Sequence, residues 1–372
     1  MALRLAEPGR TYVTLDDPLI RDLAVREPAL FLQRFRAPLI IDEIQYAPQL
    51  LSHIKMRIDS DRQNGQFWLT GSRQFQVMKG VSESLAGRIA VLRLAGFSHA
   101  ELSGRPDLPP FLPSVQALES RQGQPVLNLF SLYRLILRGS LPGLHGEDVP
   151  NRDLFLSSYV QTYLQRDIRD LANVGNELAF MRFLRAAAAR TGQLLNVADL
   201  ARDTEITQVT AKHWLSILEA SGLVFLLQPW HSNLTKRLVK TPKLYFLDTG
   251  LATWLTSWSS PETLEAGAMS GAILETWVVS ELVKGWWHDG KDAPLFFYRD
   301  KDMKEIDVLA HVDGSLHPME IKKSANPGPD ALRQFNLIEG LGARRGSGAV
   351  LCLVPTWLPA GGQDFIVGVG MI

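Results

Sequence analysis

The stretch PLIIDEIQ, residues 38–45, places the apolar run Leu39 to Ile41 directly before two acids. A continuous apolar run of this kind is typical of a strand buried on both faces, in the middle of a parallel sheet. Asp42 and Glu43 then stand at the carboxyl end of that strand. One carboxylate can hold a Mg²⁺-bound water there, and the other can orient an attacking water. A buried strand that simply ends in solvated acids is the alternative interpretation.

A second apolar run, FWLTGS at 67–72, follows downstream and ends in hydroxyl side chains. Thr70 and Ser72 can sense the γ-phosphate of a nucleotide, and Arg88 in SLAGR can stabilise charge in a transition state. The N-terminal region therefore predicts one site made by neighbouring strand ends. Its catalytic residues are Glu43 and Arg88, its cofactor-binding residues are Asp42, Thr70 and Ser72, and Asp42 is also a metal ligand.

The pattern of apolar residues divides the chain into four regions. Residues 11–103 alternate short β-type runs (TYVTL, PLII, FWLT, IAVLRL) with helix-like stretches such as PQLLSHIKMRIDSD, which predicts an α/β layer with parallel strands. Proline then crowds RPDLPPFLP at 105–113, so we place the first domain's end near residue 105. The predicted domains are 1–105, a linker and helical region at 106–175, a winged helix at 176–260, and a second α/β domain at 261–372.

The winged-helix prediction rests on short helices followed by a β hairpin. Asn196 and Thr207 are typical helix N-caps, and Gly222 ends the last helix. The polar face of the second helix, 207–221, would meet DNA bases, and a basic run after it would contact phosphates. A protein-interaction module with a solvated strand pair is the alternative. The predicted DNA-binding residues are Gln208, Thr210, Lys212, Lys236 and Arg237, and the basic run extends to Lys240 and Lys243.

A second group of acids lies near the C-terminus. Glu275 stands in a helical stretch, Asp307 in the strand EIDVLAHV, and Glu320 with Lys322 in MEIKK. Side chains two apart share one face of a strand, so Glu320 and Lys322 point the same way. This order resembles the PD-(D/E)xK nucleases, in which the acids bind Mg²⁺ and the lysine polarises water or stabilises charge at phosphorus. Glu275, Asp307 and Glu320 are thus predicted metal ligands, and Lys322 a predicted catalytic residue. Solvated acids on an exposed strand face are the alternative.

Nearly the whole chain resembles the AAA-type ATP-binding proteins of bacteria and archaea that carry a C-terminal domain of unknown function. The resemblance is carried by YVTLDDP, PLIIDEIQYAPQLLSHIK, FWLTGSRQF, SLAGRIAVLRLAGFSHAEL, YVQTYLQRDIRDL, LYFLDTGLATWL and GAILETWVVSEL, in the family's order. It implies a RecA-like P-loop ATPase domain with ATP and Mg²⁺ as cofactors. It also implies Asp42 as magnesium ligand, Glu43 as catalytic base, Thr70 or Ser72 as sensor and Arg88 as finger.

One part of that family's pattern is missing from this sequence. There a strand and a GxxxxGK[ST] loop, which cradles the phosphates, precede the YVTLDDP stretch. We expect the chain to be an N-terminally truncated member that does not hydrolyse ATP by itself. The alternatives are a metal-dependent DNA nuclease whose N-terminal region is scaffold, and a non-enzymatic DNA-binding or defence-associated regulator.

Composition adds weaker constraints. Lys and Arg (39) equal Asp and Glu (39), so a nucleic-acid surface would have to be a local patch, and DNA and a second copy of the chain both stay open as partners. The single Cys352 lies in the apolar run GAVLCLV, which predicts a buried thiol with no disulfide partner. The opening residues lack the apolar core of a signal peptide, and no apolar run is long enough for a membrane helix. We therefore expect a cytoplasmic protein without a membrane partner.

Overall fold

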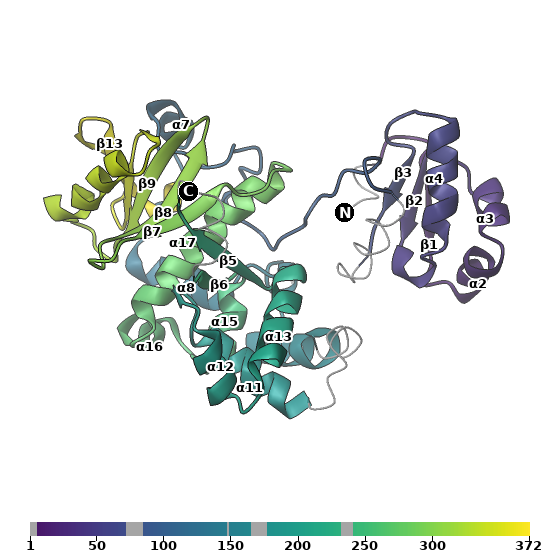
Figure 1. Ribbon diagram of the computed structural model, residues 1–372, viewed down its shortest axis with the longest axis horizontal. Helices are drawn as coiled ribbons and strands as arrows, with labels where there is room; N and C mark the ends of the chain where they lie inside the picture. Colours follow the sequence, from purple (N-terminus) through teal and green to yellow (C-terminus); the bar gives the residue numbers. More distant parts are fainter. Residues whose placement is uncertain (1–5, 72–84, 147–148, 165–176, 232–240) are drawn as a thin grey trace. The chain divides into compact units, whose positions relative to one another are not determined.

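The computed structural model describes residues 6–71, 85–146, 149–164, 177–231 and 241–372 (Figure 1). The chain divides into two compact units, 1–91 and 92–372. No helix among the described residues is both long and apolar enough to cross a membrane. The finer domain boundaries predicted within 92–372 stay predictions.

The N-terminal unit is built on a parallel sheet of strand order β1-β2-β3, as the sequence predicted. Strand β2 lies in the middle, with Ile41 opposite Val13 on one side and opposite Leu69 on the other. Asp17 caps α2 by accepting hydrogen bonds from the backbone N–H groups of Leu19 and Ile20. The strands are β1 Thr11–Thr14, β2 Leu39–Asp42 and β3 Phe67–Leu69, and the helices are α2 Pro18–Arg26, α3 Pro28–Arg34, η1 Ile44–Tyr46 and α4 Leu50–Ser60.

The core of this unit follows from the apolar run of β2. Leu39 and Ile41 pack with Phe31 of α3 and Ile54 of α4, and all four are fully buried. Ile40, on the opposite side of the strand, is also fully buried. Burial on both faces is the property expected of a central parallel strand, so the apolar letters before Asp42 identified this strand correctly.

The predicted strand IAVLRL at 89–94 is not a strand in the structure. Leu92 and Leu94 are 73% and 79% exposed, and the segment spans the division between the two units. Its apolar pattern is typical of a strand, but a strand forms only where a neighbour pairs with its backbone groups and covers its side chains. No such neighbour pairs with 89–94 among the described residues.

The C-terminal unit is organised around one long helix, α17 Ser270–His288, which contacts β6, α8, α15 and α16. This helix is apolar on nearly all sides, which is why it lies buried in the unit (Figure 1). The other helices are α6 His99–Leu102, α7 Val115–Ser120, α8 Leu129–Arg138, η2 Pro142–Leu144, α9 Arg152–Ser158, the π-helical η3 Tyr159–Leu164, α11 Glu177–Ala188, α12 Val197–Asp203, α13 Gln208–Ala220, α15 Thr249–Leu255, α16 Pro261–Ala266, η4 Pro329–Gly340 and η5 Val369–Met371.

A ten-stranded mixed sheet, of order β12-β13-β11-β9-β8-β7-β5-β6-β4 with β10 beside β9, accompanies these helices. Strand β5 pairs antiparallel with β6 and parallel with β7, so the hairpin after α13 continues into the C-terminal sheet. The strands are β4 Gln193–Leu194, β5 Val224–Pro229, β6 Lys243–Phe246, β7 Leu295–Arg299, β8 Glu305–Val312, β9 Ser315–Ile321, β10 Arg344–Arg345, β11 Ala349–Cys352, β12 Leu358–Gly361 and β13 Asp364–Gly368.

The helices before β5 begin and end where their caps predict. Asn196 caps α12 and Thr207 caps α13 through their side-chain oxygens, and Gly222 takes a φ of 69° after α13. Trp214 of α13 packs edge-on against Phe180 and Phe183 of α11. Cys352 is buried in β11, where burial raises the pKa of its thiol, so the prediction of a buried structural cysteine is confirmed.

Candidate functional site

The strand-end acid Asp42 lies between side chains from both neighbouring strands. Its Oδ2 accepts a hydrogen bond of 2.6 Å from the hydroxyl of Tyr12 on β1, and its Oδ1 accepts one from the hydroxyl of Thr70, just after β3. Asp42 ends β2 and Thr70 follows β3, so these two side chains meet at the carboxyl edge of the sheet, and Tyr12 reaches the same carboxylate from within β1. In open α/β sheets this edge is where ligands bind.

Glu43 follows Asp42 in an unusual backbone conformation. Its φ of 58° and ψ of 45° lie in the left-handed region, which a residue with a side chain like that of Glu rarely adopts. The side-chain amide of Gln45 donates a hydrogen bond to its carboxylate. Strained residues of this kind cluster at functional sites, where the surrounding structure holds them in place. The chain turns here so that η1 can begin directly after the strand.

Arg88 is held by an acid of α4. Its Nε and Nη2 donate to the two carboxylate oxygens of Asp59 at 2.6 and 3.2 Å, and both side chains are more than a third exposed. To act as an arginine finger, Arg88 would have to exchange this partner for a phosphate. Ser72 lies outside the described residues, so the structure describes one of the two predicted sensors, Thr70, and its sensor role stays a prediction.

The predicted DNA-contacting residues are described only in part. Gln208 and Lys212 are exposed at the start of α13, whereas Thr210 is half-buried and its hydroxyl pairs with the capping Thr207. Lys236 and Arg237 lie outside the described residues. DNA contact by this helix stays a prediction.

The C-terminal acids lie close enough for their charges to interact, and a lysine contacts two carboxylates of this region. We call Glu275 of α17, Glu305 and Asp307 of β8, and Glu320 of β9 the acidic centre. Lys243 of β6 donates to Glu275 Oε1 at 2.9 Å and lies 2.5 Å from Glu305 Oε1. The hydroxyl of Tyr245 donates to the same Glu275 oxygen at 2.5 Å. Lys243 was placed in the exposed basic run, but its side chain is only 5% exposed.

Asp307 and Glu320 face each other across an antiparallel pair. Val308 opposes Met319 in the register of β8 and β9, and the backbone N–H of Ile321 donates to Asp307 Oδ2 at 2.8 Å. Burial raises the pKa of Asp307 to about 8, aided by the charges of Glu275 and Glu320 and opposed by Lys243. Burial also raises the pKa of Glu320, against the hydrogen bond of 2.6 Å that its Oε1 accepts from Lys322. Both shifts favour the protonated form of this pair over that of an exposed carboxyl group.

The acidic centre does not fit a divalent metal in this arrangement. Within the described ranges, no group of three or more His, Cys, Asp or Glu side chains has a geometry that could hold a metal ion. The ammonium of Lys243 contacts two of the carboxylates that would serve as ligands. Glu320 Oε2 is the buried carboxylate oxygen of this centre that has no hydrogen-bond partner among the described residues. Metal ligation by Glu275, Asp307 and Glu320, and catalysis by Lys322, stay predictions.

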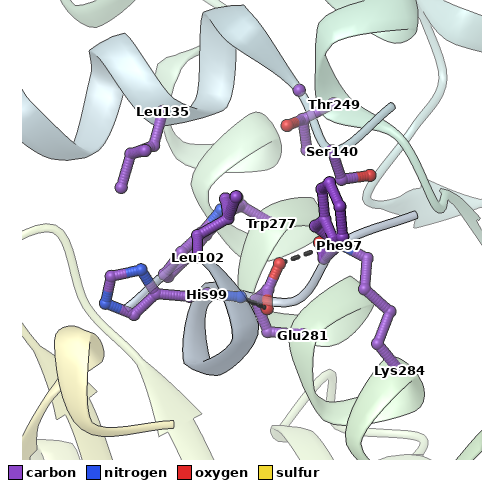
Figure 2. Close-up of a pocket in the computed structure, with 10 residues that line it drawn as sticks. Phe97, His99, Leu102, Leu135, Ser140, Thr249, Trp277, Glu281 and Lys284 are labelled. Atoms are coloured by element: carbon purple, nitrogen blue, oxygen red, sulfur yellow. Dashed lines mark hydrogen bonds and ion pairs between the residues drawn. The ribbon is translucent and has the colours of Figure 1, made fainter. Parts of the chain in front are cut away.

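A second buried ion pair on α17 was missed by the sequence analysis. Lys284 donates to Glu281 at 2.7 Å and to the backbone carbonyl of Phe97 at 3.1 Å, and the backbone N–H of His99 donates to Glu281 at 2.6 Å (Figure 2). The lining residues enclose about 10 Å³, room for about one water. The i, i+3 spacing of Glu281 and Lys284 within an apolar helix was the available signal. The burial of Lys243 could have been predicted from its position directly before the apolar run LYF, which is typical of a buried strand.

Replacing Asp307 with Asn is expected to stabilise the protein at pH 8 by about 2 kcal/mol. The folded-state pKa is raised above the ordinary value of 3.8. Between about pH 4 and 8 the unfolded chain has released a proton that the folded chain retains, so the free energy of unfolding falls as pH rises through this window. Asparagine removes that fall and still accepts the N–H of Ile321. Urea unfolding at pH 5 and pH 8 measures the difference; an equal pH dependence in both proteins would contradict the assignment.

Three family models match successive parts of the chain. Residues 2–103 match an AAA domain, residues 129–262 a domain of unknown function (DUF8612), and residues 270–368 a domain of unknown function (DUF4143). The chain thus carries an AAA domain at its N-terminal end, as its resemblance predicted, followed by two domains of unknown function. An AAA domain implies nucleotide binding at most, so these matches support no more specific activity.

The chain is also similar to uncharacterized mycobacterial proteins. It is 27% identical over 302 residues to the uncharacterized proteins Rv2008c of Mycobacterium tuberculosis and Mb2031c of Mycobacterium bovis. The match covers 81% of this chain and 62% of each relative. Among solved structures, protein VC1899 from Vibrio cholerae covers 93% of this chain and 89% of its own, at 16% identity and a TM-score of 0.20, so no fold assignment is drawn from it.

Proposed function

We propose that the N-terminal unit binds a nucleoside triphosphate with Mg²⁺ at the carboxyl edge of its parallel sheet, as part of an ATPase. The observation that carries this proposal is the meeting of Asp42, at the end of β2, with Thr70, just after β3, joined by Tyr12 from within β1. A nucleoside triphosphate binds together with Mg²⁺, and Mg²⁺ requires oxygen ligands from the protein at that edge. The AAA domain match over residues 2–103 supports the same assignment.

The residues present fit a magnesium ion. Each oxygen of Asp42 accepts one hydrogen bond here, and a carboxylate has about four acceptor positions in all, so the carboxylate retains capacity for a metal ligand or its water. The carboxylate of Asp42 and the hydroxyl of Thr70 would hold the ion at the carboxyl edge of the sheet. Bound Mg²⁺ supplies charge neutralisation at the phosphates. Glu43, turned by its left-handed backbone, would orient the attacking water and accept its proton.

Measurements of nucleotide binding and of the hydrolysis rate distinguish the role of Asp42 from that of Glu43. We expect the intact protein to bind a fluorescent ATP analogue in a Mg²⁺-dependent way, and Asp42→Ala to weaken that binding at least about tenfold. Glu43→Gln should retain binding, while any turnover falls by about 10²–10⁴-fold because the general base is lost. Asp22→Asn, which removes an exposed acid that forms an ion pair with Arg26 of the same helix, serves as control and should change neither.

Two outcomes would contradict this function. The first is an intact protein that shows no Mg²⁺-dependent binding of the analogue at millimolar concentration. The second is binding that Asp42→Ala and Asp22→Asn leave equally unchanged, which would place the nucleotide away from the end of β2.

A further inference from the structure

The acidic centre contains a cation supplied by the chain itself. Lys243 Nζ lies 2.9 Å from Glu275 Oε1 and 2.5 Å from Glu305 Oε1, and it also lies 5.6 Å from the centre of the Phe297 ring. The lysine side chain is 5% exposed, and the two carboxylate side chains are 18% and 25% exposed. A charge removed from water to this extent requires partners close by, and two acids provide them.

We propose that Lys243 fills the cation site of the acidic centre in place of a divalent metal, beside the ion pairs of Arg299 with Glu305 and of Lys322 with Glu320, and that the ammonium ties β6 to α17 and β8. An ammonium has three donors, and the two carboxylates occupy two of them. A metal ion at the same oxygens would meet a fixed positive charge within ion-pair distance. It could enter only if Lys243 left its buried position.

The sheet topology explains why this lysine reaches the acids. β6 pairs with β5, and β5 pairs in parallel with β7, whose other neighbour is β8. Lys243 begins β6, and Glu305 begins β8. The ion pairs therefore connect β6 to α17 and to β8, from which β5 and β7 separate it in the order of the sheet. The other lysine of the centre, Lys322, pairs with Glu320 and is 43% exposed, so it is a surface partner and not the buried cation.

The proposal predicts how Mn²⁺ should act on the full chain. The parent protein should carry Asp42→Asn, so that the N-terminal site adds no metal ligand, and should be freed of metal with a chelator. Free Mn²⁺ is then measured by electron paramagnetic resonance, and the thermal midpoint by circular dichroism. We expect the parent to show no Mn²⁺ response. Lys243→Ala should melt earlier, bind Mn²⁺ at least about tenfold more tightly than the parent, and recover roughly 2–4 °C at an Mn²⁺ concentration ten times its Kd.

Two further variants isolate the cause. Lys243→Met should also melt earlier but show no recovery with Mn²⁺, because its side chain fills the space that alanine opens. Lys284→Ala removes an equally buried lysine from Glu281 on the same helix, and it should melt earlier without recovery because one carboxylate alone does not hold the ion.

Parent protein that binds Mn²⁺ as tightly as Lys243→Ala would overturn the proposal, as would a folded Lys243→Ala without any Mn²⁺ response. If Lys243→Ala does not fold, the parent decides the matter. If the parent binds Mn²⁺ and Glu275→Gln abolishes that binding, the proposal is overturned. If the parent does not bind Mn²⁺, the proposal is upheld. Neither result depends on nucleotide binding by the N-terminal unit.

Discussion

Glu275→Ala is expected to lower the free energy of unfolding by about 3–5 kcal/mol, the usual loss when one partner of a buried ion pair is removed. Glu275 Oε1 accepts hydrogen bonds from both Lys243 and Tyr245, and the tyrosine is fully buried. Alanine would leave the tyrosine hydroxyl without this acceptor and the ammonium with one carboxylate fewer. Urea unfolding at pH 7, without added metal, measures the loss.

The sign of this change separates two kinds of acidic centre. Carboxylates gathered to hold a metal repel one another in its absence, so removing one of them stabilises the metal-free protein. Glu275 is instead one of the two carboxylates in ion-pair contact with Lys243, so its removal destabilises the protein, in contrast to the removal of Asp307. Glu275→Gln, which keeps an oxygen acceptor for Tyr245, should lose less than Glu275→Ala. The control is Glu262→Ala on α16, an exposed glutamate whose loss should stay within about 0.5 kcal/mol. A gain in stability for Glu275→Ala would contradict this role of Glu275.

Trp214→Ala is expected to cost about 3–5 kcal/mol of unfolding free energy, the range for truncating a large buried aromatic side chain. Trp214 is 5% exposed, and its ring lies 5.2 Å from the rings of both Phe180 and Phe183 at steep angles. Edge-to-face contacts of this kind add about 0.5–1.5 kcal/mol each beyond the buried area. Circular dichroism during urea unfolding follows the change without relying on tryptophan fluorescence.

The same helix supplies the control for this prediction. Val209 of α13 is 78% exposed, so Val209→Ala should alter stability by less than about 0.5 kcal/mol. A loss below about 1 kcal/mol for Trp214→Ala would mean that the packing of α13 on α11 contributes little to holding the C-terminal unit together.

The acids at the strand ends could be predicted from sequence because the signal is local. The apolar run before Asp42 identified a strand buried on both faces, and the alternation of MEIKK placed Glu320 of β9 on the same side as Lys322, which follows the strand and pairs with Glu320. The hairpin prediction that brings Asp307 beside Glu320 is confirmed by the register of β8 and β9. Each of these inferences uses the period of one element or the short connection between two adjacent ones.

Two features required the tertiary structure. Residues 89–94 have the pattern of a strand but no pairing partner among the described residues, because pairing depends on neighbours that a local pattern does not specify. Lys243 has the sequence context of an exposed basic run, yet the parallel pairing of β5 with β7 brings it to acids on α17 and β8. The sequence by itself determined which residues carry charge and which of them lie in or next to a strand. Only the assembled sheet decided that this lysine is buried among those acids, since a buried charge is set by contacts between segments distant in the chain.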